Sequence, residues 1–144
     1  MPDSSSRPFH LTVIAVAALL WQGVWAVDYL AHRLDIEAWL AHVPPGWTAF
    51  LDAQPAWGGA LWAAAVWAGF LGAVLLLMAE RGAVLLFALA FLAMMGWLGV
   101  LLLEAAPVPD FMGYPGWQVA FAAALVLFLL WLYARALKTR GRLG

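Results

Sequence analysis

The side chains that could carry chemistry in this chain gather near the end of its first apolar stretch. One face of a helix would carry four of them, at spacings i, i+4, i+7 and i+11: Trp21, Trp25, Asp28 and His32. Because Asp28 and His32 are one helical turn apart, we expect a hydrogen-bonded pair or a proton relay. A carboxyl group inside an apolar stretch is a functional candidate. The alternative is that Asp28, near the end of its helix, pairs locally and extends to the interface.

A wider candidate cluster of polar and aromatic groups surrounds this face: Gln22, Trp25, Asp28, Tyr29, His32 and Glu104. Glu104 ends the third apolar stretch at a similar depth, so Asp28 and Glu104 could share a proton or a cation if those helices are neighbours. Aromatic faces beside carboxylates suit an organic cation. They also suit sugar rings or a partner protein. The alternative is an interfacial tryptophan belt combined with side-chain packing.

The chain lacks the residues that most catalytic mechanisms need. The chain has no cysteine, its only lysine is Lys138, and its serines lie in the N-terminal tail. A serine nucleophile beside a base, a Schiff-base lysine inside the bundle and a thiolate metal site are therefore excluded. We predict no catalytic residue, no cofactor and no metal site, and hence a protein that is not an enzyme.

The composition indicates a membrane protein. Of 144 residues, 67% are hydrophobic and 10% are charged, against about 45–50% and about 25% in soluble domains. Four stretches approach the roughly 20 apolar residues that a membrane helix needs: residues 11–30, 57–78, 83–103 and 117–137. We predict an all-α integral membrane four-helix bundle, a single domain over residues 1–144 with cytoplasmic tails at 1–10 and 138–144.

The charges predict an orientation. One side of the membrane would carry six basic residues: Arg7, Arg81, Arg135, Lys138, Arg140 and Arg142. The other side would carry only Arg33, together with most of the acids. Cytoplasmic segments are enriched in Lys and Arg, so we expect both termini in the cytoplasm and the protein in the bacterial inner membrane. A cleaved signal peptide is the alternative for the first stretch, and Trp21 and Gln22 argue against it.

Residues 31–56 separate the first two stretches. Helical spacing of Ile36, Trp39, Leu40 and Val43 predicts a short interfacial amphipathic helix of about ten residues, ended by Pro44-Pro45-Gly46 and followed by a short turn at 47–52. The alternative is an ordered loop on the outer surface. Within the second stretch, we expect helix packing along a small-residue stripe flanked by Ala65, Gly69 and Ala73; the stripe is Ala60, Ala64, Ala68 and Gly72.

Several motifs resemble a known family. The pattern Trp21-Gln22-x-x-Trp25-x-x-Asp28-Tyr29 is followed by Pro55-Ala-Trp57, Trp62 and Val66-Trp67-Ala-Gly69-x-x-Gly72. Over residues 11–100 the chain is similar to small four-helix membrane proteins of Gram-negative bacteria, loosely labelled sugar-transporter-like, whose function is not established. That family's first motif usually has Asn at position 22 and Gly at position 25, where this chain has Gln22 and Trp25. The resemblance implies the four-helix architecture.

The expected role is a non-enzymatic accessory or interaction subunit. The expected partners are the lipid bilayer and either further copies of this chain or a larger membrane complex, without nucleic acid. The alternative is an oligomeric small-solute transporter for a sugar or an organic cation, with Asp28 as the coupling carboxylate.

Overall fold

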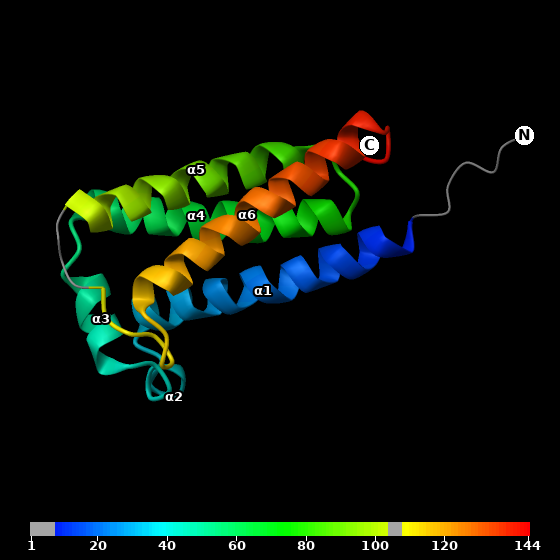
Figure 1. Ribbon diagram of the computed structural model, residues 1–144. Coiled ribbons are helices and arrows are strands. Elements are labelled where there is room, and N and C mark those ends of the chain that lie inside the picture. Colours follow the sequence, from blue (N-terminus) through cyan, green and yellow to red (C-terminus); the bar gives the residue numbers. More distant parts are fainter. Residues whose placement is uncertain (1–7, 104–107) are drawn as a thin grey trace, which may run out of the picture.

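Six helices form the described part of the chain in the computed structural model, which describes residues 8–103 and 108–144. Four are long: α1 (Phe9–Leu34), α4 (Ala56–Leu77), α5 (Gly82–Leu103) and α6 (Gly116–Thr139). Two are short and lie between α1 and α4: α2 (Glu37–Leu40) and α3 (Pro45–Asp52). The predicted all-α four-helix bundle is confirmed, with span boundaries within a few residues of those expected (Figure 1).

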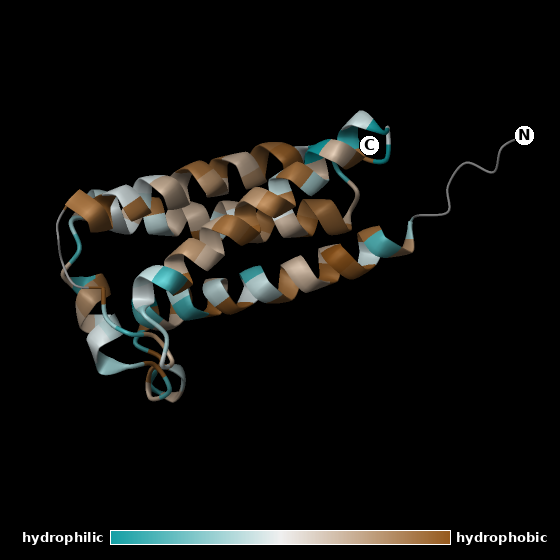
Figure 2. Ribbon diagram, viewed as in Figure 1, coloured by the Kyte–Doolittle hydropathy of each residue, from teal (hydrophilic) through white to brown (hydrophobic). Residues whose placement is uncertain are grey.

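The long helices have the dimensions of membrane spans. They contain 26, 22, 22 and 24 residues, which corresponds to about 33–39 Å at about 1.5 Å per residue. A hydrocarbon core is about 30 Å thick. All four are apolar enough to cross it, and hydrophobic residues run along them (Figure 2). Leu20, Leu85, Leu92 and Leu129 are exposed on their outer faces, as expected of helices that contact lipid rather than water.

The long helices pack in a fixed order. Close backbone contacts join α1 to α4, α4 to α5, and α5 to α6, and α6 crosses the α4–α5 pair obliquely (Figure 1). The buried side of α4 carries Ala65, Gly69, Gly72 and Ala73, whereas Ala60 and Ala64 are exposed. The predicted stripe was therefore wrong at Ala60 and Ala64. The flanking residues make the contact because they lie on the side of α4 that faces its neighbours.

The segment between α1 and α4 folds over one end of the bundle. Helix α1 ends where Asp35 adopts a left-handed conformation with φ 49°, and Ile36 is extended. The chain therefore changes direction, and α2 has 4 residues rather than the predicted ten or so. Proline at the first position of α3 suits a helix start. Val43 and Trp47 are buried, so this segment is a packed cap and not a free loop.

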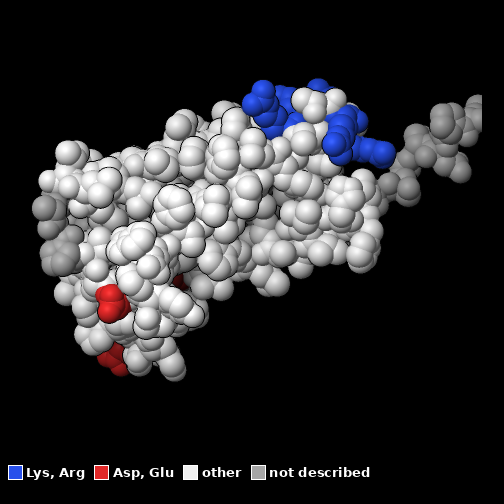
Figure 3. Space-filling view, in the orientation of Figure 1, with Lys and Arg blue, Asp and Glu red and all other residues white. Residues whose placement is uncertain are grey.

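Charge separates the two ends of the molecule. The beginning of α1, the α4–α5 turn and the end of α6 share one end (Figure 1). On the visible face, Lys and Arg gather there, whereas Asp and Glu lie at the opposite end (Figure 3). We call these the basic end and the acidic end. The start of α1 and the end of α6 lie at the same end of the bundle, and the placement of both termini on the cytoplasmic side of a membrane remains a prediction.

Candidate functional site

Asp28 is a buried carboxyl group at the acidic end. It lies six residues before the end of α1 and is 3% exposed. The indole Nε1 of Trp39, on α2, donates a hydrogen bond to Asp28 Oδ1 over 3.0 Å. The left-handed turn at Asp35 makes this contact possible, because it folds α2 back along α1. Asp28 therefore pairs locally, as one alternative expected, but its side chain does not extend to the surface.

His32 contacts Asp28 through the backbone. Its Nδ1 lies 2.8 Å from the Asp28 carbonyl oxygen and 3.6 Å from Asp28 Oδ1. Its Nε2 lies 3.3 Å from the hydroxyl oxygen of Thr48 on α3. A neutral imidazole with its proton on Nδ1 satisfies both hydrogen bonds, since Nδ1 donates to the carbonyl and Nε2 accepts from the hydroxyl. The predicted one-turn pair exists as a close contact, and the hydrogen bond of His32 Nδ1 goes to the Asp28 carbonyl and not to its carboxylate.

The second carboxylate oxygen, Asp28 Oδ2, is buried and has no hydrogen-bond partner among the described residues. Asp28 lines a cavity of about 730 Å³, which we call the aromatic pocket. Five aromatic rings line it: Trp21, Trp25, Trp39, Phe111 and Tyr114. The rest of the lining is Val24, Ala38, His42, Val43, Met112 and Val119. Among the described residues, Asp28 is the only acid in this lining.

Three parts of the chain build the aromatic pocket. Helix α1 supplies Trp21 and Trp25, whose rings meet edge to face at 6.0 Å. The segment before α6 supplies Phe111, which lies 6.2 Å from Trp25. Phe111 and Tyr114 exchange two backbone hydrogen bonds, of 2.8 and 3.0 Å, across a tight turn. Positive φ angles at both central residues of that turn explain the glycine at its third position.

Gln22 lies deeper in the bundle. It is 3% exposed, and a Cβ on Gly69 would come within 2.7 Å of its Oε1, so α1 and α4 approach closely here. Gln22 also borders a cavity of about 20 Å³ between the long helices, which is enough for one water molecule. This places Gln22 outside the aromatic pocket.

Tyr29 faces α4. Its ring centroid lies 4.9 Å from that of Trp62 and 5.9 Å from that of Trp67. The guanidinium carbon of Arg33 lies 5.4 Å from the same centroid. Of the predicted cluster, Trp25 and Asp28 share the aromatic pocket and His32 lies beside it. Gln22 and Tyr29 point elsewhere, and Glu104 falls outside the described residues.

Sequence reasoning missed three lining residues that matter most for the pocket. Trp39, expected on the apolar face of an interfacial helix, is outside the predicted cluster, and so are Phe111 and Tyr114. The aromatic residues flanking Met112-Gly113 are the available signal, because glycine favours a tight turn that brings its neighbours together. Nothing in the spacing of these residues indicates that the turn packs against Trp25.

A second buried polar contact lies behind α3. Trp97 Nε1, on α5, donates to Gln54 Oε1 over 2.8 Å. Gln54 Nε2 and Trp47 Nε1 are buried without a partner among the described residues. These groups tie the cap to α5 and offer no titratable side chain.

The part of the chain that the structure describes contains no group of side chains suited to bind a metal ion. No three His, Cys, Asp or Glu side chains of residues 8–103 and 108–144 come together as a metal site would require. The aromatic pocket offers a single carboxylate, which suits a monovalent organic cation better than a divalent metal ion.

Comparison of this chain with family models, curated proteins and solved structures finds no match. The chemistry of the site therefore rests on its geometry.

Proposed function

We propose that this protein is a non-enzymatic multi-pass membrane protein that binds a hydrophobic organic cation in the aromatic pocket, as a small-solute carrier does. The observation that supports it best is that Asp28, whose buried Oδ2 has no hydrogen-bond partner among the described residues, lines a pocket with five aromatic rings. Cation–π attraction and one carboxylate favour a monovalent cation. Ligand sites typically enclose about 300–1,000 Å³, and the volume of about 730 Å³ falls within that range.

The lining favours an organic cation over a sugar. A buried polar group without a hydrogen-bond partner costs about 1–3 kcal/mol, and a sugar carries several hydroxyls. The lining is mainly hydrocarbon and aromatic, and its polar side-chain groups are those of Asp28, His42, Tyr114 and the indoles. A hydrophobic cation leaves fewer groups unpaired and gives Asp28 a counter-charge.

Tetraphenylphosphonium and tetraphenylborate test this proposal, since they share one shape and differ in the sign of charge. We expect the purified protein in detergent micelles to bind the phosphonium with a saturable change in tryptophan fluorescence. Asp28→Asn should weaken this binding at least tenfold, because it removes the charge and keeps the shape. Asp52→Asn is the matched control, since Asp52 is an exposed acid outside the pocket lining. Equal binding of both ions, or unchanged binding by Asp28→Asn, would contradict the proposal.

Transport is tested separately in reconstituted vesicles. A carrier should accelerate uptake of benzyltrimethylammonium, a permanently charged probe that crosses bilayers poorly. Asp28→Asn should abolish that uptake if Asp28 is the coupling carboxylate. Binding without uptake would restrict the function to ligand binding.

The accessory or interaction subunit expected from the sequence is the second candidate. Its support is the exposure of Trp57 and Trp117, at 52% and 59%, where α4 and α6 begin at the acidic end. Trp and Tyr are enriched at protein interfaces. A photo-crosslinking residue at position 117 should give one defined adduct in native membranes if this face joins another subunit, whereas position 85, on the outer face of α5, serves as the control. No adduct at position 117 would argue against it.

A further inference from the structure

The basic end carries five cationic side chains in the described part of the chain: Arg81, Arg135, Lys138, Arg140 and Arg142. Glu80 is the only acid beside them there. No Lys or Arg within residues 8–103 and 108–144 forms an ion pair with a carboxylate. This end therefore carries an excess of positive charge.

The backbone holds several of these cations in place. After α6, Gly141 adopts φ 65°, and the N–H of Arg142 donates to the Leu137 carbonyl over 2.9 Å. Leu143 is buried at 3% exposure. Backbone hydrogen bonds of 2.8 and 3.0 Å join residue 144 to Ala79 and Arg81 in the α4–α5 turn. The cluster is thus a folded surface and not a flexible tail.

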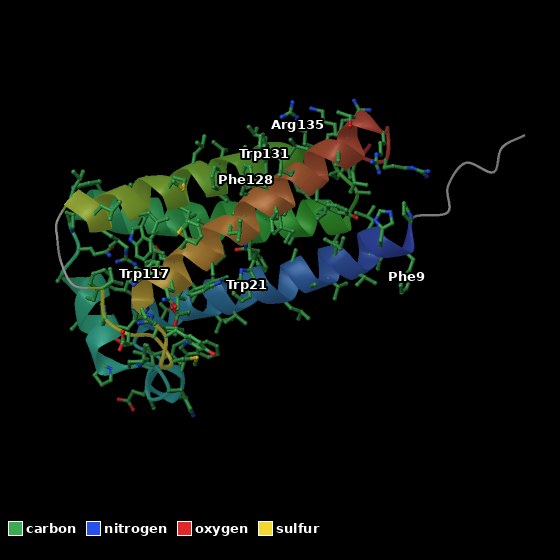
Figure 4. The ribbon with its side chains drawn as sticks, in the orientation of Figure 1. Phe9, Trp21, Trp117, Phe128, Trp131 and Arg135 are labelled. Atoms are coloured by element: carbon green, nitrogen blue, oxygen red, sulfur yellow. The ribbon has the colours of Figure 1, made fainter. Side chains whose placement is uncertain are left out.

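Aromatic rings continue from this cluster toward the middle of α6. The guanidinium of Arg135 lies 5.5 Å above the ring of Trp131. The ring centroids of Trp131 and Phe128 are 5.8 Å apart, and those of Phe128 and Phe91 on α5 are 5.2 Å apart. The three α6 residues follow one another along the same side of that helix (Figure 4). Seven residues separate Arg135 from Phe128, about 10 Å along the axis.

We infer that this surface binds an anionic phospholipid of the surrounding leaflet, with its phosphate at Arg135 and an acyl chain along the rings of Trp131 and Phe128. A guanidinium provides paired donors that match phosphate geometry, and stacking on Trp131 orients those donors. The neighbouring cations of the cluster add attraction for a negative headgroup. The rings lie at the depth of acyl chains because α6 crosses the membrane below Arg135.

Native mass spectrometry tests this inference. The purified protein is released from mixed micelles that contain equal phosphatidylglycerol and phosphatidylcholine, and retained lipid is counted. We expect phosphatidylglycerol to be retained preferentially, and Arg135→Gln to lower the ratio about fivefold, since one basic residue near a charged surface contributes about 1 kcal/mol. Arg33→Gln, at the acidic end, is the control and should leave the ratio unchanged.

Two further variants separate the parts of the site. Trp131→Leu should also lower the ratio while keeping every charge, because it removes the ring that orients Arg135. Thermal unfolding in phosphatidylcholine alone should be the same for Arg135→Gln and the wild type, which shows that the variant folds. An equal ratio of the two lipids in the wild type, or an unchanged ratio in Arg135→Gln, would overturn the inference. Displacement of phosphatidylglycerol by millimolar inorganic phosphate would also overturn it, since the surface would then bind a free anion and not a lipid.

Discussion

Replacing Trp39 by Phe tests how strongly the cap depends on one side-chain hydrogen bond. The change keeps an aromatic ring and removes the N–H that donates to Asp28 Oδ1 over 3.0 Å. Asp28 is 3% exposed, so loss of the indole donor leaves a largely buried acceptor. Leaving a buried acceptor without a partner costs about 1–3 kcal/mol. The smaller ring adds a loss of burial of about 1 kcal/mol.

A double-mutant cycle separates these two contributions. In the Asp28→Leu background no carboxylate remains, and Trp39→Phe should cost only the loss of burial. The difference between the two backgrounds, a coupling of about 1–3 kcal/mol, measures the hydrogen bond. Free energies of unfolding are measured by circular dichroism in mixed micelles with increasing dodecyl sulfate. Trp117→Phe, at a residue 59% exposed, is the control and should change stability by less than about 0.5 kcal/mol.

One result would refute this reasoning. If Trp39→Phe destabilises the protein equally with and without Asp28, the hydrogen bond does not hold α2 against α1. The cap would then be held by packing at Val43 and Trp47 alone.

Three further predictions concern stability in the same unfolding assay. Gly69→Ala should destabilise the protein by about 1–3 kcal/mol, because the added Cβ would lie 2.7 Å from the buried side-chain amide of Gln22. Gly99→Ala, with nothing within 4 Å of its added Cβ, should be neutral or stabilising by up to about 1 kcal/mol. Equal effects of the two substitutions would contradict the α1–α4 packing. Trp97→Phe should lower the free energy of unfolding by about 1–3 kcal/mol, because it removes a hydrogen bond. Trp47→Phe should lower it less, because the Trp47 N–H has no partner among the described residues. A larger loss for Trp47→Phe than for Trp97→Phe would contradict this account. Ala79→Gly should stabilise by about 0.5–1 kcal/mol, since Ala79 has φ 60° in the α4–α5 turn; a loss of stability would count against the turn geometry.

The long helices could be predicted from the sequence because the requirement that defines them is local. About twenty consecutive apolar residues can cross a membrane as a helix, because a helix pairs its backbone N–H and C=O groups internally. Such a helix can be predicted without knowing its neighbours. Proline stands immediately before α4 and α6. The length of α2 could not be predicted in this way, because it depends on Asp35, whose left-handed conformation ends α1 and turns the chain into α2.

Only part of the site followed from helical spacing. Successive helical residues point about 100° apart, so Asp28 faces the aromatic pocket while Tyr29 faces Trp62. Grouping the two by their closeness in sequence was therefore misleading. Trp39 and Phe111 reach Asp28 and Trp25 through chain reversals, and periodicity carries no information about such contacts.

The contacts among the long helices determine how α1 and α6 are placed around the aromatic pocket. Helix α4 packs against α1 and α5, and α5 packs against α6, while side chains of α1 and α6 border the same small cavity. The four long helices contain no proline, which is a common cause of sharp helix kinks. At the basic end α1 meets α6 where His10 Nδ1 lies 2.7 Å from the hydroxyl of Tyr133.

Asp28 lies 18 residues from His10, about 27 Å along α1, so a tilt of about 5° about that contact displaces it by about 2 Å. Trp39 would travel with α1 through its hydrogen bond to Asp28, whereas Val119 belongs to α6. Both α1 and α6 therefore line the aromatic pocket, and a tilt of one helix relative to the other would change its width.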